Sequence, residues 1–595
     1  MSFLSLLAAV LASAGEFMFI GRDIGPRHPL PDVPSTRALI PELTLHPVRT
    51  NETEWTYPLR QLKTPTDKAG RPKPFLLNLR PRLSERPHLV LFDKVVVDGA
   101  DYAKWCSEHP EYLGMQTLEW VHDAQTPYSP EWLARHRKNT PFAVTEDEAR
   151  AALKRNEYEH GREDRHQFST NLLKNAYNRI VELSFGDASR LFIGDGTYCT
   201  DHLVADWGAG GLAFETTRNY YFWQIQMMFT RGAAVQYGIP FRWYIASFFN
   251  DGNQTADTPE TGLSVSAVKR VSYLSYFSGA ASYQREAGVE LAYCYRRNPD
   301  ASRNGTFGPE GLDYDEFYRF CTRHPRGEPY RAAALVVPIH RGYTRQGGAA
   351  YRGLFPYSRE DHLLDAVMSV ILDFPKNKDR SALKRHAERV MANSRYGDVF
   401  DVLCPDGERR ETFRTALPRY RVAFVIGDYD SETDDALAAF ERQGGRVIRL
   451  SSDLVPWDGD DERSRQEALA RVGCDRVMDF SQPVRFLEIE RIMDSQVLQL
   501  LPFDVSGDVQ FGFNRVPDGW IVYLINNAGV FKPSVGLASF NGAGSDVVID
   551  LKGKGVLGVR MLGADADKEL VVEDGRVRIN VPSGDVRIVQ ILQED

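Results

Sequence analysis

Short apolar runs and helical patterns alternate along the chain from about residue 88 to about residue 330. Apolar runs bounded by glycine are typical of buried strands, and apolar residues at three- and four-residue spacing are typical of helices. The pattern predicts strands at 88–92, 112–120, 190–194, 211–217, 240–248, 281–288 and 332–339, and helices at 145–182, 219–238 and 264–279. Alternating strands and helices pair the strands in parallel, so we expect an α/β fold with a (β/α)8, TIM-like barrel.

The segment before this region has a different composition. Residues 20–85 are rich in Pro and Arg and contain few periodic runs, so they are predicted to be an extended lead-in that wraps the barrel. An open doubly wound sheet is the alternative to the barrel. No G-x-G-x-x-G motif or P-loop lies in the barrel region to favour a nucleotide-binding sheet.

Two further units follow. Residues 331–495 contain a strand at 420–427, a helix at 431–443 and a strand at 446–450, which predict a flavodoxin-like α/β domain. Residues 496–595 contain short alternating runs separated by turn signals, among them the pair Asp574 and Gly575. This spacing predicts a C-terminal antiparallel β-sandwich. The expected domains are therefore 15–330, 331–495 and 496–595.

Composition narrows the class of protein. The 595 residues carry a net charge of -9, which argues against a general nucleic-acid binder. Residues 1–14 form a short apolar segment that ends in Ala-x-Ala, which predicts a signal peptide and a secreted or periplasmic protein. No later run is long and apolar enough to predict a membrane span. The six cysteines form no C-x-x-C pair, and no metal or cofactor is expected.

Three of the predicted strands end on a glutamate: Glu119, Glu215 and Glu286. An unpaired carboxylate is costly in a core, but at the mouth of a barrel it faces a pocket. Two facing carboxylates are the catalytic groups of glycoside hydrolysis, so Glu215 and Glu286 are predicted to be the catalytic pair. For each of them, a structural ion pair under a loop is the alternative.

Residues near these strand ends are predicted to bind the substrate. Aromatic side chains stack on sugar rings, and polar ones bind sugar hydroxyl groups. The predicted substrate-binding residues are Glu119, Trp120, Asp195, Tyr221, Trp243, Asn250, Tyr283 and Arg285. A place in the core is the alternative for Trp243. Asp195 lies in an acidic loop with Asp201, His202 and Asp206, whose spacing matches no strong metal-binding motif.

This layout resembles that of the clan A glycoside hydrolases, and it is most similar to the three-domain β-galactosidases of family 42. The resemblance implies a general acid/base at Glu215 on the fourth barrel strand and a nucleophile at Glu286 on the seventh. Phe214 stands where that family has the Asn of its Asn-Glu pair, and the family's metal-binding cysteine cluster is not evident. The resemblance also implies that the middle domain can assemble into a homo-oligomer.

We therefore expect an exported glycosidase that degrades a polysaccharide or an oligosaccharide, with carbohydrate as its partner. Two other classes stay open. One is a non-catalytic carbohydrate-binding protein that keeps the barrel, and the other is a polysaccharide lyase.

Overall fold

The computed structural model describes most of the chain, and the following account concerns the described residues alone. These residues are 17–22, 30–45, 47–51, 54–79, 96–118, 165–194, 199–217, 223–246, 262–285, 307–343, 351, 355, 358–372, 391–454, 486–533, 536–540, 542 and 544–593.

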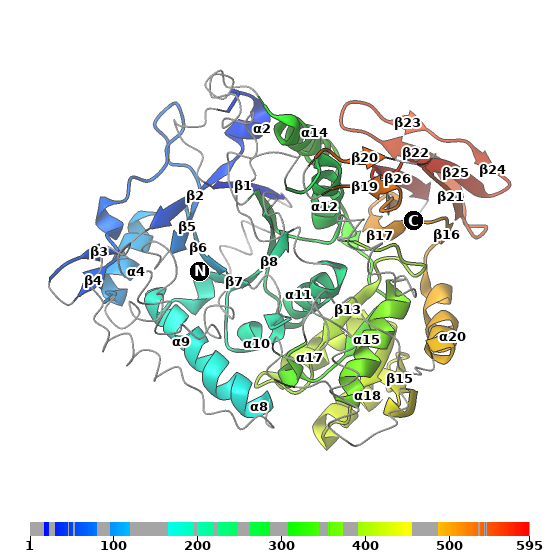
Figure 1. Cartoon of the computed structure of the whole chain (residues 1–595), viewed down its shortest axis with the longest axis horizontal. Helices are drawn as coiled ribbons and strands as arrows, with labels where there is room; N and C mark the ends of the chain where they lie inside the picture. The colour runs from blue at the N-terminus through cyan, green and yellow to red at the C-terminus, as the bar shows by residue number, and fades with distance from the viewer. Residues whose placement is uncertain are drawn as a thin grey trace.

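Eight parallel strands close into a barrel, which Figure 1 shows as a ring of strands with helices outside it. In chain order they are β1 (Met18–Arg22), β2 (Ile40–Leu45), β5 (Phe75–Leu79), β6 (Tyr112–Leu118), β7 (Leu191–Gly194), β8 (Gly211–Thr217), β9 (Phe241–Ala246) and β10 (Ser282–Arg285). Each strand pairs with its neighbour in the sequence order, and β10 pairs with β1 to complete the ring. The predicted TIM-like barrel is confirmed.

The first three barrel strands lie where the sequence predicted an extended lead-in, so that prediction is wrong. β1, β2 and β5 are five or six residues long, and β2 contains Pro41, so their local patterns are weak. The strand predicted at 88–92 lies outside the described residues. Because β1, β2 and β5 are the first three barrel strands, β6 is the fourth, and Glu215 lies on the sixth, β8.

Helices connect the barrel strands and cover the outside of the barrel (Figure 1). The main ones are α4 (Gly99–Glu108), α9 (Lys174–Leu183), α10 (Asp201–Asp206), α11 (Trp223–Tyr237), α12 (Val265–Phe277) and α14 (Pro309–Arg323). A π-helix (Phe168–Leu173) joins α8 (Arg165–Gln167) to α9. Asp98 caps α4 and Ser264 caps α12, each accepting backbone N–H groups of the first turn. α11 is buried along nearly its whole length, because it lies between the barrel and the next sheet.

That next sheet has four parallel strands in the order β13 (Phe400–Leu403), β12 (Ala333–Val336), β14 (Val422–Ile426) and β15 (Arg446–Leu450). The strand predicted at 332–339 therefore belongs to this sheet, not to the barrel. The helices of this region are α15 (Arg359–Ile371), α17 (Arg410–Ala416), α18 (Ser431–Arg442) and α20 (Phe486–Val497). Its flavodoxin-like character and its boundaries stay predictions.

The C-terminal region consists of antiparallel sheets, as the alternating runs predict. One sheet contains β11 (Glu328–Pro329), β17 (Gln510–Val516), β18 (Gly519–Ile525), β26 (Val586–Gln593), β22 (Val556–Leu562) and β23 (Lys568–Glu569). The other contains β16 (Asp504–Ser506), β21 (Ser545–Asp550), β25 (Arg576–Val581) and β24 (Val572–Glu573). Asp574 and Gly575 connect β24 to β25 with positive φ angles of 50° and 71°, as a tight hairpin requires.

Smaller elements complete the described chain. They are α2 (Pro34–Arg37), the strand pair β3 (Val48–Arg49) and β4 (Trp55–Thr56), the hairpin β19 (Val530–Phe531) and β20 (Ser539–Phe540), and the 3₁₀ helices Leu59–Gln61, Ala188–Arg190, Ile339–Arg341, Leu417–Arg419, Ser452–Leu454 and Leu498–Leu500.

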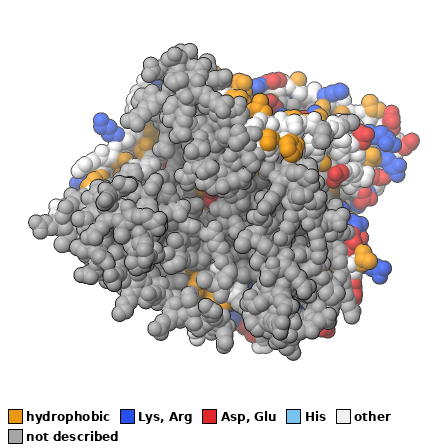
Figure 2. Space-filling view, in the orientation of Figure 1, with side chains coloured by type: hydrophobic (Ala, Val, Ile, Leu, Met, Phe, Trp, Pro, Cys, Tyr) orange, Lys and Arg blue, Asp and Glu red, His pale blue; other side chains and the backbone are white. Residues whose placement is uncertain are grey.

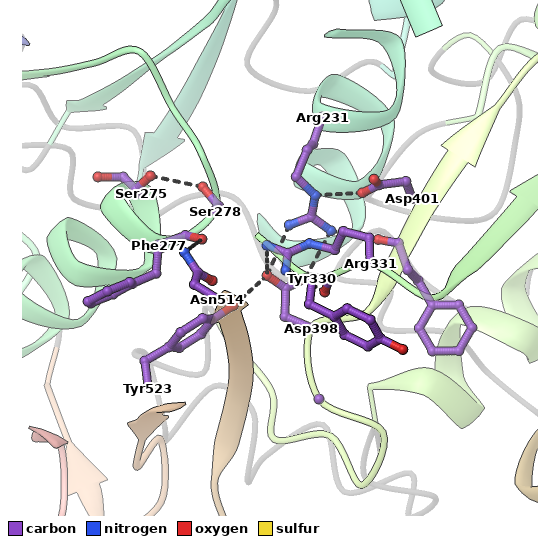
Figure 3. Close-up of polar contacts among 12 residues, drawn as sticks. Arg231, Ser275, Phe277, Ser278, Tyr330, Arg331, Asp398, Asp401, Asn514 and Tyr523 are labelled. Carbon is purple, nitrogen blue, oxygen red and sulfur yellow. Dashed lines mark hydrogen bonds and ion pairs between the residues drawn. The ribbon is translucent and has the colours of Figure 1, made fainter. Parts of the chain in front are cut away.

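A buried ion-pair network joins the three regions (Figure 3). Arg231 of α11 contacts Asp398 at 2.9 Å and Asp401 of β13 at 2.5 Å. Arg331 contacts Asp398 at 3.1 Å, and Tyr523 of β18 donates to the same carboxylate at 2.7 Å. Burial disfavours ionisation of Asp398, but the charges of Arg231 and Arg331 outweigh it and hold its pKa below the usual value. One carboxylate thus ties the barrel's helix to both other regions.

The visible coloured surface mixes charges of both signs over the C-terminal sheets (Figure 2). Hydrophobic side chains gather near α14 in the same view. The large exposed hydrophobic residues of α14 and the β19–β20 hairpin region include Leu312, Leu537 and Phe540, with 62%, 65% and 54% exposure. Among the described residues, no helix combines the length and the apolar character needed to cross a bilayer.

Replacing Arg231 by Leu is expected to destabilise the protein by about 3–5 kcal/mol, because it leaves Asp398 and Asp401 buried without their main cation. Urea unfolding followed by circular dichroism measures this loss. Arg449→Leu is the control, since Arg449 and its partner Asp434 are about half exposed and pair at the surface. It is expected to change stability little. Equal losses in both variants would contradict the assignment.

Candidate active site in the barrel interior

The register of the barrel strands determines which side chains face its interior. Gln284 of β10 donates to Glu42 of β2 at 2.9 Å, a bond that passes β1 and therefore crosses the interior. Arg242 of β9 donates to Ser282 and to Gln284, each at 3.1 Å. Side chains alternate along a strand, so these contacts fix the inward positions of every paired strand. The inward residues include Ile20, Ile40, Glu42, Leu76, Asn78, Gln116, Phe192, Ala213, Glu215, Arg242, Tyr244, Ser282 and Gln284.

This interior is unusually polar. Branched apolar side chains usually fill the interior of such a barrel. Here the buried inward residues include the carboxyl, amide and guanidinium side chains of Glu42, Asn78, Gln116, Glu215, Arg242 and Gln284. Burying these groups costs free energy that apolar residues would not cost. The composition of the interior therefore indicates a role beyond packing.

Glu215 lies toward the carboxyl end of β8, and its side chain faces the interior. Its outward neighbours hold the strand in place. Phe214 packs against Trp243 with ring centroids 4.3 Å apart, and the Trp243 indole donates to the Thr216 hydroxyl at 3.3 Å. The carboxyl ends of the strands form the face of a TIM-like barrel where active sites occur. Glu215 is therefore a buried carboxyl group on the chemically relevant side of the barrel.

A polar layer lies beneath Glu215. Inward side chains from alternate strands of such a barrel share layers, and the register assigns Glu42, Gln116, Ala213 and Gln284 to one of them. Asn78 also donates to Glu42, at 3.4 Å. Burial lowers the pKa of Arg242 to about 10, while the charge of Glu42 opposes this shift. Arg242 thus stays a cation at neutral pH.

Three of the predicted substrate-binding residues face away from the interior. Trp243 is buried against Phe214, and Tyr283 accepts a hydrogen bond from Ser272 of α12 at 2.8 Å. Arg285 pairs with Glu310 of α14 at 2.8 Å and lies 3.8 Å from Asp313. Their contacts are with the strands and helices of the outer layer. The hypothesis that they line one cleft with Glu215 does not agree with this placement, and we do not retain it.

The helical layer around Arg285 holds a second buried carboxyl group. Burial raises the pKa of Asp313 to about 7, although Arg285 and Lys269 oppose this shift. The Arg285 contacts are therefore those of a structural cation that fastens β10 to α14.

Six predicted site residues lie outside the described residues: Glu119, Trp120, Asp195, Tyr221, Asn250 and Glu286. Three of them directly follow the last described residue of a strand. Glu119 follows Leu118 of β6, Asp195 follows Gly194 of β7, and Glu286 follows Arg285 of β10. Their roles stay predictions.

The acidic loop after β7 has a structural role in its described part. Asp201 accepts from Thr230 at 2.9 Å. Asp206 accepts the backbone N–H groups of Glu408 and Arg409 at 2.6 and 2.9 Å. These bonds join α10 to α11 and to the segment that precedes α17. In the part of the chain that the structure describes, no group of three or more His, Cys, Asp and Glu residues forms a metal-binding cluster.

Sequence reasoning missed the polar residues of the barrel interior. Glu42, Asn78, Gln116 and Arg242 each stand in a short, largely apolar strand. In each case, a single polar residue inside an apolar run was the signal that could have indicated a site residue. Only the register shows that it faces inward.

Comparisons with known proteins add no identification. No protein-family model matches the chain, and no curated protein matches it. An α-L-fucosidase isoenzyme 2 from Paenibacillus thiaminolyticus is similar over 84% of this chain and 80% of its own, at 10% identity and a TM-score of 0.44. An α-fucosidase from Thermotoga maritima is similar over 80% of this chain and 94% of its own, at 10% identity and a TM-score of 0.17. The carboxyl transferase domain of Rhizobium etli pyruvate carboxylase is similar over 96% of this chain and 90% of its own, at 11% identity and a TM-score of 0.20. At these scores the similarities carry no argument about activity.

The stability of the protein is expected to depend on His202 in mildly acidic solution. His202 bonds the Val402 carbonyl at 3.1 Å, and burial lowers its pKa from 6.5 to about 3. Below pH 6.5 His202 binds a proton in the unfolded chain but stays neutral in the folded protein. The free energy of unfolding therefore falls as the pH is lowered, until about pH 3, where His202 is also protonated in the folded protein.

His202→Gln keeps an N–H donor but does not titrate, so it removes this dependence. Between pH 6.5 and pH 5 the wild type is expected to lose about 2 kcal/mol more stability than the variant. Urea unfolding at the two pH values measures the difference. Parallel pH profiles for the two proteins would contradict the assignment.

Proposed function

We propose that this chain is a glycoside hydrolase that cleaves glycosidic bonds of a polysaccharide or an oligosaccharide, with Glu215 as one of two catalytic carboxyl groups. The observation that carries the proposal is the position of Glu215. It is buried, faces the interior and lies near the carboxyl end of a barrel strand, directly above a polar layer. Glycosidases need such a carboxyl group within reach of the scissile bond.

Glu286 is the proposed second carboxyl group. Ser282 and Gln284 of β10 face inward, and a continued two-residue alternation along the sequence predicts an inward position for residue 286. β8 and β10 are the sixth and eighth strands, and alternate strands contribute side chains to a common layer. These features favour a facing pair of Glu215 and Glu286.

Glu119 is a weaker candidate. It directly follows β6, and it remains a proposed contact of the sugar rather than one of the catalytic pair.

The roles of the two carboxyl groups are open. The resemblance assigned acid/base to the fourth strand and nucleophile to the seventh, whereas Glu215 lies on the sixth strand and Glu286 follows the eighth. Hydrolysis requires one carboxyl group to be protonated toward the leaving group and the other to be ionised. Trp120, Asp195, Tyr221 and Asn250 remain proposed contacts of the sugar, and export of the protein remains part of the proposal.

Replacement of Glu215 or Glu286 by Gln is expected to reduce kcat by at least about a hundredfold, because Gln neither donates a proton nor attacks. Release of nitrophenol from a panel of nitrophenyl glycosides measures turnover, and reducing-end release from polysaccharides covers longer substrates. Glu569→Gln is the matched control, since Glu569 is exposed on β23 of the C-terminal sheet, and we expect it to keep full activity.

Other outcomes separate the other classes of function. Sugar binding without turnover of any glycoside by the wild type would identify a carbohydrate-binding protein. An unsaturated product that absorbs in the ultraviolet would identify a lyase. Full activity of Glu215→Gln would reject Glu215 as a catalytic residue.

A further inference from the structure

Gln116 stands out in the layer beneath Glu215. Its side chain is 1% exposed and faces the barrel interior. Neither Oε1 nor Nε2 of its amide has a hydrogen-bond partner within the described part of the chain. A buried amide without partners costs about 1–3 kcal/mol. An apolar residue of similar size would avoid this cost, so packing alone does not account for Gln116.

The neighbours of Gln116 do not use its amide. Ala213, from the next strand that contributes to the layer, offers only a methyl group. Both polar atoms of Gln284 have partners, since Nε2 donates to Glu42 and Oε1 accepts from Arg242. The layer therefore contains one amide that fixes the network and another that is available to a ligand.

Arg242 provides a second available group. Its Nε and Nη2 atoms donate to Ser282 and Gln284, while its buried Nη1 has no partner in the described structure. The guanidinium plane lies over the Phe192 ring, 5.0 Å from its centroid, which holds it in place. Both available groups face the barrel interior, and the contacts of Arg242 with Ser282, Gln284 and Phe192 hold its guanidinium in position before a ligand arrives.

We propose that Gln116, together with Arg242, forms a binding subsite for hydroxyl groups of a neutral sugar ring whose glycosidic bond is presented to Glu215. This inference rests on the proposed function, and it adds which groups of the substrate the barrel interior binds.

The chemistry of the subsite selects its ligand. Gln116 offers one acceptor and two donor hydrogens from a single plane, which suits a pair of adjacent hydroxyl groups that both donate and accept. Arg242 offers a donor to a hydroxyl oxygen. Among the interior side chains that the structure describes, two carboxyl groups, Glu42 and Glu215, accompany a single guanidinium, that of Arg242, so an anionic sugar finds no excess of positive charge in this set. A neutral hexose or deoxyhexose therefore fits better than a uronic acid.

The test compares Gln116→Leu with Gln284→Leu. Removing the unpartnered amide of Gln116 is expected to leave the melting temperature unchanged or raised, and to weaken sugar binding by at least about tenfold. Removing the engaged amide of Gln284 is expected to lower the melting temperature, since Glu42 and Arg242 both lose a partner. A purely structural Gln116 would behave like Gln284.

Binding is measured by isothermal calorimetry and by ligand-induced shifts of the melting temperature, with D-glucose, D-galactose, D-mannose, L-fucose and D-glucuronate as probes. We expect at least one neutral sugar to bind the wild type and Glu215→Gln, and to lose affinity in Gln116→Leu.

The outcomes distinguish this subsite from the proposed activity. Sugar binding that depends on Gln116 without any glycoside turnover keeps the subsite and rejects the hydrolase. Turnover with unchanged affinity and unchanged KM in Gln116→Leu keeps the hydrolase and rejects the subsite. A lowered melting temperature with unchanged affinity, or binding of glucuronate alone, also overturns the subsite.

Discussion

The closed barrel imposes one constraint on everything else in this protein: every second side chain of its strands is confined to a narrow interior. Polar groups placed there lose water and must find partners in the protein or in a ligand. Gln284 meets this requirement for Glu42 and Arg242 together, since it donates to the carboxylate at 2.9 Å and accepts from the guanidinium at 3.1 Å. The amide of Gln284 thus links a buried carboxylate to a buried guanidinium, and Glu215 lies one layer closer to the carboxyl ends of the strands.

The opposite faces of the same strands hold this interior in shape. Trp243 locks β8 and β9 through Phe214 and Thr216, and Arg285 fastens β10 to α14. α11 connects the barrel to the parallel sheet, because its Arg231 forms ion pairs with Asp398 and Asp401. The outward side chains of these strands therefore hold the barrel in shape, while the neighbouring inward side chains form the candidate site.

Local sequence pattern was sufficient where strands are apolar and bounded by turns. It located β6 to β10 within a few residues and predicted the antiparallel sheets of the C-terminal region, because the pattern that marks these strands lies in consecutive residues. It failed for β1, β2 and β5, whose pairing partners determine them more than their own composition does. β1, for example, pairs with β10, more than two hundred residues away.

The site was predictable to a similar degree. Glu215, which the sequence singles out at the end of an apolar strand, lies at an inward register position of β8, and its catalytic role stays a proposal. The sequence could not separate inward from outward positions near other strand ends, since the two differ by one residue of register. Trp243, Tyr283 and Arg285 were therefore assigned to the substrate, while Glu42, Gln116, Arg242 and Gln284 were overlooked.

Glu215 and Glu286 are proposed to face each other at the carboxyl end of the barrel strands. A crystal structure with both carboxyl groups resolved tests this proposal most directly. The account predicts a separation of about 5–5.5 Å for a retaining enzyme or about 6.5–9.5 Å for an inverting one. A Glu286 side chain directed into the helical layer, or a separation well beyond this range, would contradict it.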